Sequence, residues 1–198
     1  MHALLVAVVV GVEFCVVFYG AALLHTGAGL DAAEAAAAMG LFVAGELTGR
    51  VAGGRLTRRP GRARALVLGA LTVTAGGFAL LWLADRPLVA LVGLTATGLG
   101  VANLYPLGLA LALAAAPGRT DQAAGRTQLL VGAAVGLAPF ALGALADAVG
   151  VRGALTVEPV LLALALALLA AGSYWSRRPQ QLRPPERDSL IREGTCRL

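Results

Sequence analysis

One acidic side chain, Glu13, lies near the middle of the first long apolar run of this sequence, residues 3–24. If that run crosses a lipid bilayer, a carboxylate at its centre costs at least ~2.5 kcal/mol, so the protein must compensate for it. Glu13 could carry a proton or contact a substrate, with Phe14, Phe18 and Tyr19 as neighbouring walls. It could equally be a protonated side chain that hydrogen-bonds to another helix, and both interpretations stay open.

A second set of polar side chains interrupts the apolar run at residues 88–115. Asn103 and Tyr105 precede Pro106, and a proline inside a membrane helix frees a backbone carbonyl nearby. These groups could contact a polar substrate, since an amide both donates and accepts hydrogen bonds. An interhelical hydrogen bond with a structural kink is the equally weighted alternative. Gln128, at the start of the next apolar run, could reach the same cavity.

Two sets of an acid and an arginine lie near the predicted helix ends. Glu46 and Arg50 are four residues apart, which places them on one face of a helix. A structural ion pair near the membrane surface is favoured there over a gate that exchanges partners. Asp147 and Arg152 are predicted to close the loop between the fifth and sixth apolar runs, with gating as the secondary reading.

The elements that must position these residues are long apolar helices. The 198-residue chain is 58% hydrophobic and only 14% charged, whereas a soluble domain carries about 25% charge. Six runs of about 20 residues, the length that crosses a bilayer, are separated by short breaks rich in Gly, Pro or charge. The expected spans are residues 3–24, 33–54, 65–84, 88–115, 124–147 and 154–174.

The arginines predict the orientation of these spans. All sixteen basic residues are Arg, and most fall in the break at 55–64, near 119–126 and after residue 176. With six spans these groups share one side of the membrane, and the positive-inside rule makes that side cytoplasmic. We therefore expect a cell-membrane protein with both termini in the cytoplasm: a bundle over residues 1–175 and a flexible, polar tail over 176–198.

Several function classes are excluded by what the sequence lacks. The arginines follow membrane topology, so the net charge of +5 does not indicate nucleic-acid binding. Gly-x-Ser-x-Gly, His-Glu-x-x-His and nucleotide-binding loops are absent. The two cysteines should lie far apart, and no metal site or cofactor is expected. The chain is therefore not predicted to be an enzyme.

Small residues predict how the helices associate, because close packing replaces the hydrophobic effect in lipid. The second span has Gly45, Gly49 and Gly53 at spacing four, and the fifth has Gly132 and Gly136. The third and sixth spans are mostly Leu, Ala and Val, so we place them at the lipid-facing periphery. A faint repeat between residues 45–53 and 143–150 suggests two three-helix halves in inverted orientation, as in many secondary transporters.

Three stretches resemble the major facilitator superfamily. Residues 49–64 (GRVAGGRLTRRPGRAR) look like its cytoplasmic loop between the second and third helices of a half. Residues 98–113 (GLGVANLYPLGLALAL) are similar to the tenth helix, and residues 138–155 (APFALGALADAVGVRGAL) to the eleventh and twelfth. The order and spacing resemble the C-terminal six helices. The resemblance assigns a gating or loop role to Glu46, Gly49, Arg50, Gly53, Gly54, Arg55, Arg58 and Arg59.

The resemblance implies an all-α, polytopic membrane protein of six transmembrane helices built as two inverted three-helix repeats. It also implies secondary active transport of an unidentified small solute by alternating access, with proton coupling as an option. The family usually has twelve helices, and the loop here lacks the family's usual acidic residue. We therefore expect a half-transporter that pairs with a second six-helix half or forms a homodimer. The alternative is a non-transporting truncated remnant or an accessory membrane subunit.

Overall fold

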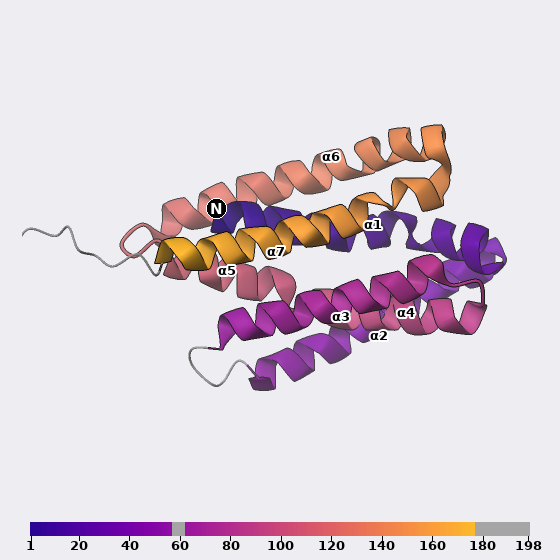
Figure 1. Ribbon diagram of the computed structural model, residues 1–198, viewed down its shortest axis with the longest axis horizontal. Helices are drawn as coiled ribbons and strands as arrows, with labels where there is room; N and C mark the ends of the chain where they lie inside the picture. The colour runs from indigo at the N-terminus through magenta and orange to yellow at the C-terminus, as the bar shows by residue number, and fades with distance from the viewer. Residues whose placement is uncertain (57–61, 177–198) are drawn as a thin grey trace, which may run out of the picture.

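Long helices make up the chain, and they lie roughly side by side in one elongated bundle (Figure 1). The computed structural model describes residues 1–56 and 62–176. Within these residues the helices are α1 (His2–Ala28), α2 (Ala32–Leu56), α3 (Ala63–Leu83), α4 (Pro87–Val101), α5 (Leu104–Ala114), α6 (Thr120–Ala154) and α7 (Val157–Ser176). Because α4 and α5 follow each other as one interrupted span, the described helices make six spans.

The apolar runs of the sequence account for these helices. By length and composition, five described segments suit a membrane crossing, among them Pro87–Ala114, which combines α4 and α5. The apolar segment Val157–Gly172 of α7 is shorter. The predicted fold class, an all-α polytopic bundle, is confirmed. The predicted tail begins beyond α7 and lies outside the described residues.

Helix-breaking residues mark two breaks, one within the fourth span and one between the fifth and sixth spans. The fourth span breaks at Ala102 and Asn103, just before Pro106, which has no N–H to donate to the preceding turn. The predicted break at 148–153 is a single turn at Gly150, whose φ of 76° and ψ of 163° are non-helical. A positive φ is readily accessible only to glycine, so α6 changes direction there.

The first helix of each three-span repeat packs between the second and third spans of the other repeat. α1 packs against α6 and α7, and α4 packs against α2 and α3. Figure 1 shows that α1 begins, and α7 ends, at the same end of the bundle, while α4 begins at the opposite end. The two repeats therefore have opposite orientations, as expected when each contains an odd number of spans.

The prediction that the third span lies at the lipid-facing periphery is wrong, and the fifth span is the more exposed one. α3 buries Val67, Leu71, Thr74, Gly77, Phe78 and Leu81. In α6 only Thr127, Leu142 and Ala154 are buried. Apolarity is a poor guide to burial in lipid, because lipid solvates leucine as well as a protein core does. Burial depends instead on how closely helices approach each other at glycines. Gly77 on α3 and Gly93 on α4 leave no room for a Cβ between the two helices.

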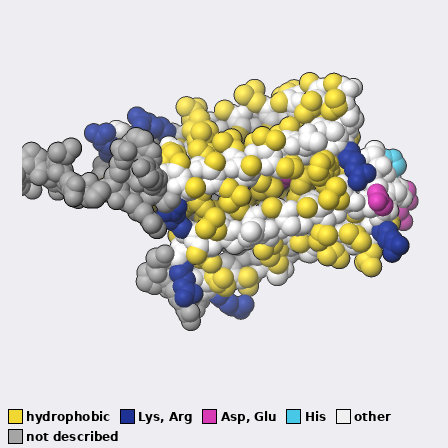
Figure 2. All heavy atoms as spheres, in the orientation of Figure 1, with side chains coloured by type: hydrophobic (Ala, Val, Ile, Leu, Met, Phe, Trp, Pro, Cys, Tyr) yellow, Lys and Arg dark blue, Asp and Glu magenta, His cyan; other side chains and the backbone are white. Residues whose placement is uncertain are grey.

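Charge is segregated to the two ends of the bundle (Figure 2). One end carries the described arginines Arg55, Arg62, Arg64, Arg119 and Arg126 at helix ends. The other end carries His25, Asp31, Glu34 and Asp85, together with Arg86 and Arg152. Hydrophobic side chains cover the visible flank between the two ends. This distribution is that of a bundle with a lipid-exposed girdle.

Candidate functional site

The predicted proton carrier Glu13 faces a second acid. Glu13 is half-buried near the middle of α1, and its carboxyl lies within hydrogen-bonding reach of that of Glu46 on α2. Glu46 is also half-buried, and its Oε1 has no hydrogen-bond partner among the described residues. A hydrogen bond between two carboxyl groups requires a proton on one of them, because two carboxylates offer only acceptors. A proton on either carboxyl group would allow such a bond to form between α1 and α2.

Arg50 lies close to this acid pair without forming the predicted ion pair. Its charge acts on Glu13, but no ion pair within 4.0 Å joins it to Glu46, four residues earlier on α2. Arg50 is exposed, while Glu46 is half-buried against α1. In place of the predicted ion pair within one helix, Glu46 faces the Glu13 carboxyl of the neighbouring helix.

The aromatic residues near Glu13 divide into two groups. The rings of Phe14 and Phe18 lie 5.5 Å apart, and Phe18 is 44% exposed. Tyr19 instead donates its hydroxyl hydrogen to the carbonyl oxygen of Pro139 on α6, at 3.2 Å. Its hydroxyl lies against Gly143, where a Cβ would come within 3.1 Å of it. Tyr19 thus fixes α1 against α6, while Phe18 stays on the surface.

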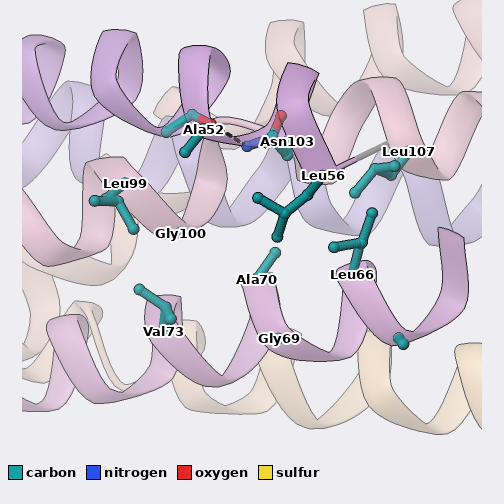
Figure 3. A pocket seen from close by; sticks show the side chains of 13 residues that line it. Ala52, Leu56, Leu66, Gly69, Ala70, Val73, Leu99, Gly100, Asn103 and Leu107 are labelled. Carbon is teal, nitrogen blue, oxygen red and sulfur yellow. Dashed lines mark hydrogen bonds between the residues drawn. The ribbon is translucent and has the colours of Figure 1, made fainter. Parts of the chain in front are cut away.

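Asn103 is bound to the backbone of α2. Its Nδ2 donates to the carbonyl oxygen of Gly49 at 2.6 Å, and a Cβ on Gly53 would overlap its amide. Figure 3 shows the amide at the wall of a pocket of about 250 Å³ that is lined mainly by apolar side chains of α2, α3, α4 and α5. Of the two interpretations weighed for Asn103, this geometry favours the interhelical hydrogen bond.

Tyr105 and Gln128, which the sequence predicts to lie near one cavity, form a hydrogen bond. The Tyr105 hydroxyl donates to Oε1 of Gln128 at 2.9 Å, which connects α5 with α6. Gln128 is exposed and Tyr105 is half-buried. The two side chains are therefore close together at an accessible surface, where both could rearrange around a polar solute.

At the opposite end of the bundle, Arg152 contacts Asp85 and the backbone of Trp82, and the loop-closing role predicted for Asp147 and Arg152 stays a prediction. The Nη2 of Arg152 lies 3.9 Å from Oδ1 of Asp85, and its Nε donates to the carbonyl oxygen of Trp82 at 3.1 Å. The Trp82 indole returns a hydrogen bond to the Arg152 carbonyl oxygen at 3.0 Å. The turn at Gly150 separates Asp147 from Arg152. Arg152 thus joins the two inter-helix turns that follow α3 and α6.

The glycine–arginine segment after Glu46 combines packing positions with a charged helix end. Gly49 and Gly53 lie against α4 and Asn103, whereas a Cβ added to Gly54 would meet nothing within 4 Å. Arg55 is exposed near the end of α2. Arg58 and Arg59 lie outside the described residues, and their predicted loop role stays a prediction.

Sequence reasoning did not single out Glu158. This residue is 0% exposed in the first turn of α7, and neither carboxyl oxygen has a hydrogen-bond partner of good geometry among the described residues. Its nearby polar neighbour is Cys15 on α1. The sequence does show Glu158 within the apolar stretch TVEPVLL. Because this stretch lies near a predicted helix end, the sequence did not indicate that neighbouring helices would bury the side chain. Among the described residues, no three His, Cys, Asp or Glu side chains converge as a metal site.

Comparison with known proteins agrees with this arrangement. No curated protein and no solved structure matches the chain. The family model described as Major Facilitator Superfamily matches residues 3–194, which include both three-span repeats, the acid pair and Glu158. Members of this family are non-enzymatic membrane transporters of solutes. With its inverted repeats, its apolar girdle and this nearly full-length match, the chain belongs to the Major Facilitator Superfamily.

Proposed function

We propose that this protein moves a small solute by proton-coupled secondary transport, with Glu13 and Glu46 as the coupling site. The observation that carries the proposal is the close approach of the Glu13 and Glu46 carboxyl groups between α1 and α2, with Arg50 nearby. Loss of the shared proton leaves two like charges in contact, and like charges at this separation repel strongly in a medium of low dielectric constant. Protonation therefore favours α1 and α2 close together, and deprotonation favours their separation or a new contact with Arg50.

Such a change couples proton binding to solute binding only if the two events favour different arrangements of the helices. The Tyr105–Gln128 pair is the best candidate for the solute side, because it joins the two repeats at an accessible surface. Phe18 offers an exposed aromatic wall on α1. An amide, a phenol and aromatic rings suit a small polar or cationic solute, in agreement with the family's transport function.

We further propose that the bundle works with a second six-helix half, either a second copy or a different chain. The support comes from α6, which carries polar and apolar groups together on surfaces that the chain does not cover. Leu129 is 75% exposed and Phe140 is 78% exposed. A Cβ added to Gly132 or Gly136 would meet nothing within 4 Å. The sequence also resembles the C-terminal half of the family, which predicts that a second half is needed.

The orientation in the cell is part of the proposal. The Arg-rich end would face the cytoplasm, with the start of α1 and the end of α7 on that side. The cell membrane is the proposed location. An inside-out arrangement would place the described arginines Arg55, Arg62, Arg64, Arg119 and Arg126 on the outer face. Single cysteines are introduced at Thr120 and at Asp31, and their labelling by a membrane-impermeant thiol reagent in intact cells distinguishes the two orientations.

The transport proposal is tested with purified protein in liposomes that enclose a pH-sensitive dye. Sugars, organic acids and organic cations are added in turn, and we expect one class to drive proton movement. Glu13→Gln and Glu46→Gln should each abolish that movement, while the matched control Glu34→Gln, an exposed acid on α2, should retain it. Full proton coupling in Glu13→Gln would contradict the proposed coupling site.

Mass measurement of the intact assembly in lipid nanodiscs tests the second half. We expect a dimer of this chain or a complex with another six-span chain. A monomer that transports on its own would overturn the half-transporter proposal. A stable complex with a complete transporter, without solute movement by this chain, would identify the alternative role of an accessory subunit.

A further inference from the structure

A lateral groove lies between α2 and α3 and reaches the arginine-rich end of the bundle (Figure 3). It is the pocket of about 250 Å³ that Asn103 borders, and its lining runs from Gly49 to Leu56 on α2 and from Ala65 to Val73 on α3. At a rise of 1.5 Å per residue, these limits extend about 10 Å along α2 and about 12 Å along α3. The groove therefore follows the helices, which is also the direction of a lipid acyl chain in a bilayer.

The groove is open at its rim and almost entirely apolar. Leu56 is 53% exposed, Val73 39% and Leu99 38%, so other helices of the chain leave these lining residues uncovered. A Cβ added to Gly69 in the groove wall would meet nothing within 4 Å. The amide of Asn103 already donates to the backbone of α2. Because pockets for drug-sized molecules have about 300–1,000 Å³, this smaller groove suits a narrow apolar chain.

Two exposed arginines lie at the helix ends where the groove begins. Arg55 belongs to the last turn of α2, and Arg62 is the N-cap residue of α3. Neither forms an ion pair with any acid that the structure describes, and the first turn of α3 contains no acid. Arg64 has a different role, because its Nη2 donates to the carbonyl oxygen of Leu169 on α7 at 2.7 Å. Arg55 and Arg62 therefore offer positive charge to an anion at the end of the groove.

The combination of an apolar groove and a cationic end determines which occupant fits. A phospholipid holds its acyl chains parallel to membrane helices, and its phosphate lies at the bilayer surface, about 15 Å from the centre of a hydrocarbon core of about 30 Å. Helix ends, and with them Arg55 and Arg62, lie at that same level. A second copy in the same orientation would bring its own arginines to this level, whereas an anionic lipid brings the opposite charge.

We propose that the groove between α2 and α3 binds one acyl chain of an anionic phospholipid, with Arg55 and Arg62 bound to its phosphate group. Basic pockets between membrane helices recognise lipid headgroups in this way. The groove fixes the position of the lipid, but an acyl chain gains little by leaving other lipid for an apolar wall. The preference for this lipid therefore comes from its charge. The site is separate from Glu13 and Glu46 and does not depend on the proposed transport activity.

The test compares dioleoyl phosphatidylglycerol with dioleoyl phosphatidylcholine, which has the same acyl chains and no net charge. Binding of each lipid to the delipidated full chain is measured by native mass spectrometry. We expect a preference for phosphatidylglycerol of at least about fivefold, the size of one arginine contact at a membrane surface. Arg55→Gln and Arg62→Gln should each reduce this preference, while the matched control Arg119→Gln, an exposed arginine at the N-cap of α6, should retain it. Equal binding of the two lipids, or an equal loss in Arg119→Gln, overturns the proposal.

Two glycine substitutions on α3 locate the site. Gly69→Leu places a side chain in the groove without a clash, and Gly76→Leu is the matched control, because its Cβ also meets nothing within 4 Å but the residue does not line the groove. We expect Gly69→Leu to remove the preference for phosphatidylglycerol and Gly76→Leu to retain it, with both melting temperatures close to that of the unmodified chain. If Gly69→Leu does not fold, the arginine variants decide.

Three outcomes assign the groove or the arginines to something else and contradict the proposal. Full lipid preference in Gly69→Leu would mean that the arginines attract anionic lipid without the groove. Displacement of the bound lipid by millimolar glycerol 3-phosphate, which carries the charge without acyl chains, would identify a site for a free phosphate. A lower dimer fraction in Gly69→Leu with unchanged lipid binding would identify an interface between two copies of the chain.

Discussion

Two helices carry the same small-residue pattern and use it differently. On α2, the glycines at spacing four lie against the backbone of α4: a Cβ on Gly45 would overlap the carbonyl oxygen of Thr95, and one on Gly49 that of Leu99. Backbone atoms in a packed helix cannot move aside as a flexible side chain can. The α2 stripe is therefore a closed interface within the chain.

On α6 the corresponding glycines are open. A Cβ on Gly132 or Gly136 would meet nothing within 4 Å, and the large neighbours Leu129 and Phe140 are exposed. Identical spacing therefore does not specify the same contact. The difference shows that a small-residue stripe reports the capacity for close approach, and that the partner helix decides whether this capacity is used. For α6 we propose that the partner is the second half.

The largest expected effect is on the closed stripe. Gly45→Leu should prevent folding or lower the free energy of unfolding by more than ~3 kcal/mol, beyond ordinary overpacking, because the clash is with backbone. Thermal unfolding in detergent, followed by tryptophan fluorescence, measures the change. Gly54→Ala, a position of the same helix with open space, is the matched control and should be neutral or slightly stabilising. A well-folded Gly45→Leu protein would break the comparison.

A substitution in the open glycine stripe of α6 should weaken association with a second half and leave the folding of the chain unchanged. Gly136→Leu should leave the melting temperature of the isolated chain nearly unchanged, since the added side chain meets no neighbour within the chain. It should weaken assembly with a second half by about 1–3 kcal/mol. Intact-mass measurement in nanodiscs over a range of protein concentrations gives the assembly constant. A large loss of melting temperature would show that α6 is already covered within the chain.

A smaller effect is expected at the hydrogen bond that completes the α2 interface. Asn103→Ala removes the donor to the Gly49 carbonyl oxygen, and we expect a loss of about 1 kcal/mol, typical of interhelical hydrogen bonds in membranes. Asn103→Asp is the informative companion, because it keeps the size of the side chain but supplies no amide donor. Chemical unfolding in mixed micelles measures both. If Asn103→Ala unfolds at the same point as the unmodified chain, the hydrogen bond does not hold α2 in place.

The smallest effect is expected beside the open stripe. Tyr105→Phe removes the hydroxyl that donates to Gln128 across the α5–α6 contact. Because this contact is solvent- or lipid-accessible, the stability of the bundle should fall by about 0.5 kcal/mol or less. Solute-driven proton movement should fall more than stability does if the pair contacts the solute. Equal changes in Gln128→Ala and Tyr105→Phe are expected, since each removes the same hydrogen bond.

The acid pair shows how far spacing along the chain can be trusted. Glu46 and Arg50 have the separation of an intrahelical ion pair, yet the Glu46 carboxyl lies against that of Glu13 from the neighbouring helix. Likewise Arg152 pairs with Asp85 and not with Asp147. In both cases the partner is distant in sequence, so the spacing of nearby residues could not predict the contact. Tyr105 and Gln128 contact each other because they flank one short connection between consecutive spans, while the predicted shared cavity stays a prediction.

What the sequence determined by itself is the set of spans and their order. Runs of about 20 apolar residues must be helical in lipid, because every backbone N–H and C=O needs a partner inside the segment. The breaks at Pro106 and Gly150 and the segregation of arginines also follow from residue type alone. The inverted repeats then follow from two groups of three spans.

The tertiary structure alone decided which faces are covered. Lipid does not distinguish a buried leucine from an exposed one, so hydropathy carries no information about the interior of a bundle. The depth of α3 in the bundle, the exposure of α6, the pairing of Glu13 with Glu46 and the complete burial of Glu158 all depend on how closely helices approach at particular glycines. How closely two helices approach depends on the surfaces of both, and the sequence of one helix describes only its own surface.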